Sequence, residues 1–344
     1  MMTKDLPEHP PTVDFLAVEN AARQIASGAL VAFPTETVYG LGARADDDAA
    51  VARIFQVKGR PSDHPLIVHV LDAQDARVFA RDVPEVAQRL MATFWPGPVT
   101  VIVPRRPGVA TACAGGQDSI GLRCPAHPVA RALLAAARAH GVTGVAAPSA
   151  NRFGRVSPTR ASHVREEFGG AVPVLEGGAC QEGIESAIVD CTRGVPVLLR
   201  PGTVSRQALE RAVGQPLRDP DETAPRASGT LASHYAPSSR VRLMTPAELQ
   251  AALERRSPWA GAGGALALYS EREPHWASSA DRAAPVWRAM PADPAHAAHG
   301  LFADLRELDA QVLALGGGEI WVALPPSDSA WDGVRDRLTR AAAA

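Results

Sequence analysis

The chain has 344 residues, of which 46% are hydrophobic and 21% are charged, and its formal net charge is -2. This length suits two domains, and the near-neutral charge does not indicate the basic surface of a strong nucleic-acid-binding protein. No apolar run approaches the roughly 18 residues that cross a bilayer, and the N-terminal segment has no signal-like apolar stretch. We therefore expect a globular protein that is not bound to a membrane.

Over about residues 12–206, short apolar runs alternate with amphipathic stretches, which is typical of an α/β domain. Strands are predicted at 29–35, 65–70, 99–104, 119–125, 141–149, 172–178, 186–192 and 195–202. Helices are predicted at 47–57, 83–95, 127–140 and 159–169, the first of them capped by Asp46 or Asp47. Because some strands follow each other directly, we expect a mixed, twisted sheet with flanking helices.

Residues 207–239 are rich in proline, glycine, serine and charge and have no sustained hydrophobic period, so they are predicted to form a long linker. A second, smaller α/β domain is expected at 240–344. Its predicted strands are 241–245, 264–270, 284–290 and 319–325, and its predicted helices are 246–256, 297–311 and 329–344. The glycine run 315–319 precedes a strand and not a helix, so it is predicted to be a turn and not a phosphate loop.

Lysine is very rare in this sequence, which uses arginine for nearly all its basic residues. Only Lys4 and Lys58 are lysines among 35 lysine and arginine residues. Lys58 and Arg60 stand just before a predicted strand, and Pro61 and Pro65, which follow them, stiffen the turn. A polyphosphate can use both the point charge of lysine and the planar fork of arginine. A solvated, charged helix end is the alternative, but the rarity of lysine favours a functional site.

Polar side chains also recur at the ends of several predicted strands. Ser149 and Asn151 follow one strand, Arg123 and Arg200 end two others, and Ser186 begins a further one. Ligands of α/β sheets commonly bind at strand ends, although such serines and asparagines can also simply cap turns. The four cysteines show no C-x-x-C pairing, so we expect buried thiols of a reducing compartment, which makes the cytoplasm the expected location.

Eight stretches carry a close resemblance to a known family. They are "FPTETVYGLGA", "KGRPSDHPLIVHV", "WPGPVT", "GLRCPAHPVA", "APSANRFGRVSPT", "GIESAIVD", "LLRPG" and "SHYAP". Together they resemble the threonylcarbamoyl-AMP synthases, in the longer form that joins a YrdC-like domain through a linker to a C-terminal α/β domain. The resemblance implies a YrdC-like catalytic domain at 12–206, a linker or lid at 207–239 and a Rossmann-like domain at 240–344.

The resemblance also implies a nucleotidyltransferase reaction, in which L-threonine, bicarbonate and ATP give threonylcarbamoyl-AMP and pyrophosphate for modification of tRNA. Mg²⁺ would accompany ATP, no metal site built from protein residues is implied, and the product would pass to a downstream tRNA threonylcarbamoyl transferase machinery. The implied catalytic residues are Lys58, Arg60, Ser149 and Asn151. Those implied for ATP are Lys58, Arg60, His64, Ser119, Asn151, Thr159, Arg200 and Tyr235, and those for threonine are Thr37, His69, Arg123, Ser149 and Ser186. The family more often has asparagine where this chain has His64.

Two other function classes are compatible with a positively charged cleft. An RNA-binding module would be expected to place aromatic residues among the cations, and aromatic residues are only 5% of this chain. Another carbamoyltransferase, acting on carbamoyl phosphate, would resemble enzymes with an acylphosphatase-like domain and paired zinc-type cysteines, and this sequence has neither. The sequence therefore favours the synthase over both alternatives.

Overall fold

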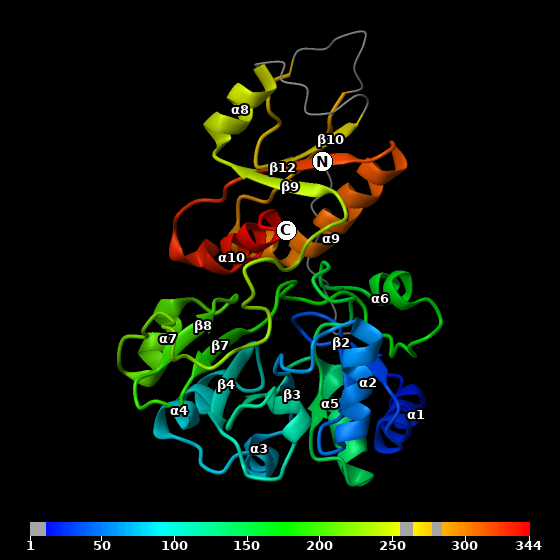
Figure 1. Cartoon of the computed structure of the whole chain (residues 1–344), viewed down its shortest axis with the longest axis vertical. Helices are drawn as coiled ribbons and strands as arrows, with labels where there is room; N and C mark the ends of the chain where they lie inside the picture. The colour runs from blue at the N-terminus through cyan, green and yellow to red at the C-terminus, as the bar shows by residue number, and fades with distance from the viewer. Residues whose placement is uncertain (1–11, 255–263, 277–283) are drawn as a thin grey trace. The chain divides into compact units, whose positions relative to one another are not determined.

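A computed structural model describes residues 12–254, 264–276 and 284–344 of the chain (Figure 1). The chain divides into two compact units. The first unit contains the chain up to Phe153 together with Ser157–Thr230, and the second contains Gly154–Val156 and Leu231–Ala344. Each unit is an α/β structure with a sheet of its own.

The first unit is built on an eight-stranded mixed sheet in the order β1-β2-β6-β3-β5-β4-β7-β8. Its strands are β1 (Val31–Phe33), β2 (Gly40–Arg44), β3 (Ile67–His69), β4 (Val99–Pro104), β5 (Ser119–Arg123), β6 (Val145–Ala146), β7 (Ala187–Asp190) and β8 (Val197–Arg200). Only the pairs β3–β5 and β4–β7 are parallel. The prediction of a mixed sheet is therefore confirmed.

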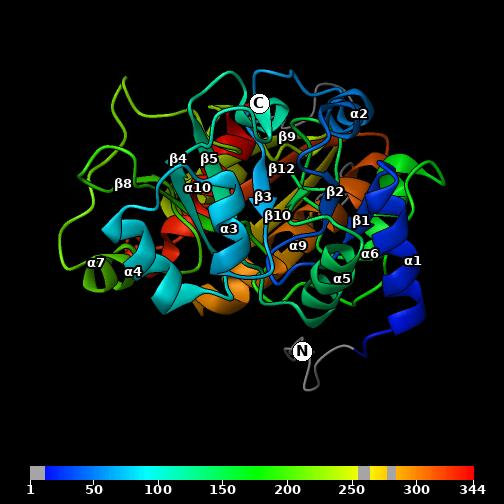
Figure 2. The same cartoon turned by 90° about the horizontal axis from the view of Figure 1, so that it is seen from below.

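Helices flank this sheet (Figure 2), and residues of the helices and the sheet share two of the hydrophobic clusters of this unit. The helices are α1 (Phe15–Ala26), α2 (Asp48–Lys58), α3 (Ala73–Phe79), α4 (Glu85–Phe94), α5 (Pro128–Ala139), α6 (Ala161–Phe168) and α7 (Arg206–Val213), with a short 3-10 helix at Thr111–Ala114. One cluster joins Ile25 of α1 and Leu133 of α5 to Phe33 of β1. The larger cluster includes Ile54 of α2 and Leu90 of α4. Asp47 caps α2, as the sequence predicts, by accepting hydrogen bonds from the amides of Ala49 and Ala50.

Several elements differ from the sequence prediction. The stretch 172–178 forms a single bridge from Val174 to Ala32 and no strand, since Pro173 has no N–H to extend a ladder. Strand β2 was not predicted because glycines weaken a strand pattern, yet glycine is needed there: a Cβ at Gly42 would lie 2.8 Å from the ring of Phe33. Helices α1 and α3 were also missed, and all but the first residue of α7 lies in 207–239, where the composition indicates only a linker.

The second unit contains a four-stranded, fully parallel sheet in the order β11-β10-β12-β9. Its strands are β9 (Arg240–Met244), β10 (Ala265–Ser270), β11 (Val286–Ala289) and β12 (Gly318–Ala323), and its helices are α8 (Pro246–Glu254), α9 (Pro294–Ala314) and α10 (Asp332–Ala342). Helix α8 covers one face of the sheet, and α9 and α10 cover the other (Figure 1). All four predicted strands and all three predicted helices are found, although residues 255 and 256 of the first predicted helix lie outside the described residues. The glycine run leads directly into β12, as the sequence predicts.

The four cysteines are free, buried thiols. Burial raises the pKa of Cys113, Cys124, Cys180 and Cys191 above that of an exposed thiol. Among the described residues, no helix combines the length and the apolar character needed to traverse a bilayer.

Candidate active site at the strand ends of the first unit

Lys58, the last residue of α2, is a buried cation held by two backbone carbonyls. Its side chain is 3% exposed, and its Nζ donates to the carbonyl oxygen of Ser149 at 2.6 Å and to that of Asn151. Burial and the neighbouring Arg60 lower the pKa of Lys58 well below its usual value. An ammonium has three N–H donors, so these two contacts leave one for a ligand. Gly59 ends the helix in the left-handed conformation, which turns the chain toward Arg60.

Arg60 contacts the segment that precedes the second unit. Its Nη2 donates to the carbonyl of Pro65 at 3.0 Å and to the hydroxyl of Ser228 at 3.4 Å. The guanidinium also stacks over Phe153, 5.9 Å from the ring centroid, and His64 meets the same ring edge-on. Partial burial and Arg60 lower the pKa of His64, so this imidazole is neutral at pH 7. As a neutral ring it can still donate one hydrogen bond to a phosphate or ribose oxygen.

A second arginine, at the end of β5, is buried among the hydroxyl and carboxylate groups of the loop that follows β1. This residue, Arg123, forms an ion pair of 2.6 Å with Glu36, and both side chains are at most 4% exposed. Its Nη1 donates to the hydroxyl of Thr37 at 2.8 Å, and Thr35 and Thr37 are hydrogen-bonded to each other. The structure therefore brings together two residues that the sequence implicates in threonine binding, and adds a carboxylate that the sequence did not single out.

Arg200, at the end of β8, donates hydrogen bonds to a third set of polar groups. Its Nε donates to the carbonyl of Ser186 at 3.1 Å and its Nη2 to the hydroxyl of the same residue at 3.3 Å. The hydroxyl of Ser186 lies 2.8 Å from that of Thr100 on β4. Arg200 also donates to the carbonyl of Ser228 at 2.8 Å, so Ser228 contacts both Arg200 and Arg60. Among the described residues, these contacts join two predicted ATP-binding arginines through one serine.

The segment Arg226–Ser228 lies over Ser119 at the start of β5. The amide of Arg226 donates to the side chain of Gln117 at 2.7 Å, and its guanidinium pairs with Asp63 at 3.1 Å. Between this segment and the residues Thr100 and Ser119 is a gap of about 10 Å³, which is roughly the space of one water. This part of the predicted linker is thus folded onto the candidate site.

The remaining predicted residues are distributed over both units. Ser149 is half-buried after β6 and bridges to Gly40 of β2, Asn151 donates to the carbonyl of Arg152 at 2.8 Å, and the amide of Thr159 donates to His163 at 3.2 Å. Tyr235 belongs to the second unit. There it is 1% exposed, has a positive φ of 63° and packs against Phe302 and Arg337.

Several residues of this site were missed by sequence reasoning. They are Glu36, Thr100, Gln117, Phe153, Arg226 and Ser228. Glu36 directly precedes Thr37 in the stretch "FPTETVYGLGA". A carboxylate in a stretch that is expected to be buried was the signal that could have indicated it. Ser228 carries no local signal, because its contacts come from residues more than 25 positions away in the sequence.

His69, at the end of β3, is a buried neutral imidazole. It is 3% exposed and lies edge-on to Phe33, and burial together with Arg123 lowers its pKa to about 3. Histidine titrates near 6.5 in an unfolded chain. Between about pH 6.5 and 3, His69 is therefore protonated in the unfolded state but not in the folded state. The free energy of unfolding falls as the pH falls through this range.

We expect this one group to lower the free energy of unfolding by up to about 1.4 kcal/mol per pH unit in that window. Urea unfolding of the wild type and of His69→Gln at pH 7, 6 and 5 measures the difference. The gap between the two proteins should change with pH in favour of the variant as the solution is acidified. Parallel pH profiles would show that His69 is not held neutral by the fold.

The fold and the site define a class: a two-unit α/β protein whose first sheet gathers lysine, arginine and hydroxyl side chains at its strand ends. The chain belongs to the Sua5/YciO/YrdC family, whose family model, described as "Telomere recombination", matches residues 23–202. A second family model, described as "Threonylcarbamoyl-AMP synthase, C-terminal domain", matches residues 204–343.

Curated relatives named threonylcarbamoyl-AMP synthase include proteins from an archaeon and a bacterium. The protein from Pyrococcus abyssi is 44% identical over 228 residues, and the protein from Bacillus subtilis is 40% identical over 233. These matches cover 64% and 66% of this chain and 66% of each relative, so the matched chain spans about two thirds of the relatives' length. The crystal structure of P. abyssi Sua5 complexed with L-threonine matches with a TM-score of 0.84 and 34% identity, over 96% of this chain and 95% of that one.

Proposed function

We propose that this protein is a threonylcarbamoyl-AMP synthase, a nucleotidyltransferase that joins L-threonine, bicarbonate and ATP. The observation that supports this proposal best is the buried set in the first unit, where Arg123 holds Thr37 and Arg200 holds Ser186. Family membership and the names of the relatives support the same reaction. The threonine named with the P. abyssi structure supports threonine as the amino acid.

The reaction needs two bond-forming steps. The neutral amine of threonine attacks the carbon of bicarbonate, the C–OH bond breaks, and one water leaves with a proton from the amine, which gives the carbamate. A carbamate oxygen then attacks the α-phosphorus of ATP, the bond to the β-phosphate oxygen breaks, and pyrophosphate leaves. Neither step requires a covalent enzyme intermediate. The protein's contribution is to position the reactants and to stabilise negative charge that develops on the phosphates.

In this proposal the threonine site is formed by Thr37, His69, Arg123, Ser149 and Ser186. Arg123 is the carboxylate partner, although Glu36 already neutralises part of its charge. Hydroxyl groups such as those of Thr37 and Ser186 can bond the β-hydroxyl or the carbamate. His69 remains neutral in this arrangement, so it contributes one hydrogen bond and no charge.

The ATP phosphates would be bound by Lys58, Arg60 and Arg200, with His64, Ser119, Asn151 and Thr159 as polar neighbours. Tyr235 belongs to the second unit. Its proposed contact with the nucleotide therefore rests on the family resemblance alone. Mg²⁺ is expected on the phosphates. The described residues contain no group of three histidine, cysteine or acidic side chains arranged to hold a metal.

A single assay separates this proposal from its alternatives. The purified chain should release pyrophosphate from ATP only when threonine and bicarbonate are both present, and it should not respond to carbamoyl phosphate. Release with carbamoyl phosphate instead would favour a different carbamoyltransferase. Absence of turnover together with tight, salt-sensitive RNA binding would favour a binding module.

Removal of the side chains of Ser149 and Asn151 should affect activity far more than stability. Lys58 contacts the backbone carbonyls of these two residues, so alanine variants keep both of those bonds. We expect Ser149→Ala and Asn151→Ala each to reduce pyrophosphate release by about tenfold or more, which corresponds to about 1.4 kcal/mol of lost transition-state stabilisation. Thermal melting is the control, and a fall in melting temperature that accounts for the lost activity would indicate capping roles instead.

The proposed partner of the product is a tRNA threonylcarbamoyl transferase machinery, and we expect no strong direct binding of nucleic acid. The free, buried thiols support the cytoplasm as the compartment.

A further inference from the structure

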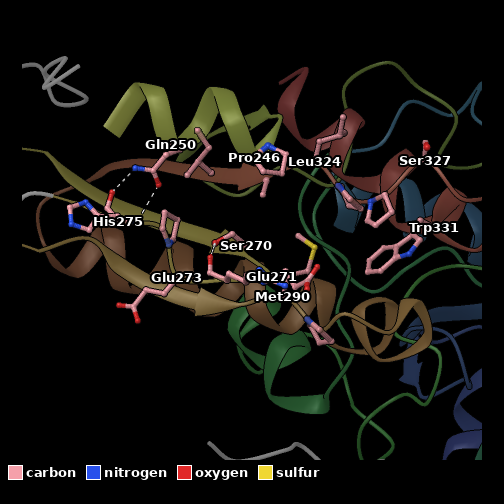
Figure 3. A pocket seen from close by; sticks show the side chains of 17 residues that line it. Pro246, Gln250, Ser270, Glu271, Glu273, His275, Met290, Leu324, Ser327 and Trp331 are labelled. Atoms are coloured by element: carbon pink, nitrogen blue, oxygen red, sulfur yellow. Dashed lines mark hydrogen bonds between the residues drawn. The ribbon is translucent and has the colours of Figure 1, made fainter. Parts of the chain in front are cut away.

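The second unit contains a cavity of about 670 Å³ that the reaction proposed above does not use (Figure 3). This volume lies in the range of small-molecule sites in proteins, roughly 300–1,000 Å³. All the residues that line it lie between Pro246 and Trp331, so the site is complete within this unit. None of them belongs to the residue set assigned to threonine or ATP.

The cavity lies at the carboxyl ends of the four parallel strands. Residues that directly follow β10, β11 and β12 line it, including Glu271, Met290 and Leu324. After β10 the chain continues to β11 on one side, whereas after β12 it continues to α10, which packs on β9 and α9 on the other side. The segments that follow the neighbouring strands β10 and β12 thus run toward opposite edges of the sheet. Open α/β sheets bind ligands at such a switch point.

The walls of the cavity are mainly apolar. They include five prolines, with Leu249, Met290, Leu324 and Trp331. Gln250 fixes one side, since its side chain donates to the carbonyl of His275 at 3.0 Å and accepts from the amide of the same residue at 3.2 Å. Figure 3 shows His275 and Trp331 toward opposite ends of the site. An elongated apolar molecule fits walls of this kind.

The polar groups at the cavity do not suit a phosphate. Helix α8 starts beside it with Pro246, which has no N–H, and the Thr245 amide is already bonded to the carboxylate of Glu248 at 2.8 Å. Asp293 and Asp328 cap the helices that follow β11 and β12. Phosphate sites in related folds use free amides at a helix N-terminus. Here these positions are occupied by the chain's own acidic and hydroxyl groups.

The charges at the rim favour a cation. Glu271 and Glu273 are exposed rim residues, and neither carboxylate forms an ion pair within the described chain, whereas Arg272 is the one arginine among the lining residues. The two carboxylates of Glu271 and Glu273 and the one guanidinium of Arg272 give the rim a net negative charge when His275 is neutral. We propose that the second unit binds a cationic amphipathic amine in this cavity, with its apolar body against Leu249 and Trp331 and its amine toward Glu271 and Glu273.

Two indole compounds of opposite charge test this proposal, tryptamine as the amine and indole-3-acetate as the acid. The full chain carries ¹³C-methyl methionine, so that Met290 reports on the cavity and Met91 in the first unit serves as an internal reference. Met290→Leu assigns the signal. Tryptamine at millimolar concentration should shift the Met290 signal and leave that of Met91 in place. Indole-3-acetate should bind about threefold to fivefold more weakly, as expected for exposed charges.

Matched variants locate the site and test the role of charge. Leu324→Trp narrows the cavity and should abolish the Met290 shift, whereas Leu313→Trp on α9, outside the lining, should leave it unchanged. Glu271→Gln combined with Glu273→Gln should remove the preference for tryptamine, and Glu222→Gln in the first unit should not. A Met290 signal that neither compound shifts, equal or tighter binding of indole-3-acetate, or an undiminished shift in Leu324→Trp would each overturn the proposal.

Discussion

Replacement of Lys58 by arginine should lower threonine-dependent pyrophosphate release by about a hundredfold or more, although the positive charge is retained. The Nζ of Lys58 fits between the carbonyls of Ser149 and Asn151 in a site that is 3% exposed. A guanidinium is larger and planar, so it cannot make both bonds and still direct a compact charge at a phosphate. Loss of one such electrostatic contact typically costs a factor of 10² to 10³ in turnover, which we take as the rough scale here.

Lys58→Met is the control for packing, because methionine has a similar length and no charge. Burial of the ammonium disfavours its charged form, so its removal should change the free energy of unfolding by no more than about 1 kcal/mol, even though two carbonyls lose a partner. Activity should nevertheless fall as far as in Lys58→Arg. Pyrophosphate release at the wild-type rate in either variant would show that the buried lysine is structural.

Removal of Arg123 should have the largest effect on stability. Arg123→Gln leaves Glu36 buried without its ion-pair partner and takes a donor from Thr37. Breaking a buried pair on one side typically costs about 3–5 kcal/mol, and we expect a loss of that size in the free energy of unfolding measured by urea. Threonine binding measured by calorimetry should disappear in the same variant.

The double variant Arg123→Gln with Glu36→Gln separates the structural role from the proposed role in binding. Two amides can hydrogen-bond in place of the ion pair, so most of the lost stability should return. Threonine binding should not return, because neither amide carries a charge for the amino-acid carboxylate. A stable double variant that binds threonine normally would contradict the assignment of Arg123 to the substrate.

The sequence predicted elements well where hydrophobic periodicity was strong. The second unit is the clearest case: the four strands and three α-helices of its described residues were all expected, because short apolar runs alternate there with amphipathic stretches. Strand β2 escaped prediction because Gly40 and Gly42 carry no side chains that could show a period. The reason for glycine at position 42 is the close approach of the Phe33 ring, which is a property of the folded chain.

For the candidate site, the sequence could indicate residue types at strand ends, but it could not indicate which of them meet. The rarity of lysine singled out Lys58, and the structure shows that it is buried. The link from Arg60 through Ser228 to Arg200 depends on a segment whose composition indicates only a linker. Contacts between residues this distant in the chain arise from topology, which local patterns do not encode.

The four buried thiols make the wild-type chain suitable for site-directed labelling. Their burial and raised pKa leave little thiolate for reaction with maleimides at neutral pH. A single cysteine introduced at an accessible position would therefore carry the label without removal of the native ones. At position 228, where the native serine contacts Arg60 and Arg200, such a probe would measure by its reaction rate how often the Arg226–Ser228 segment lifts from the sheet in the presence and absence of ATP.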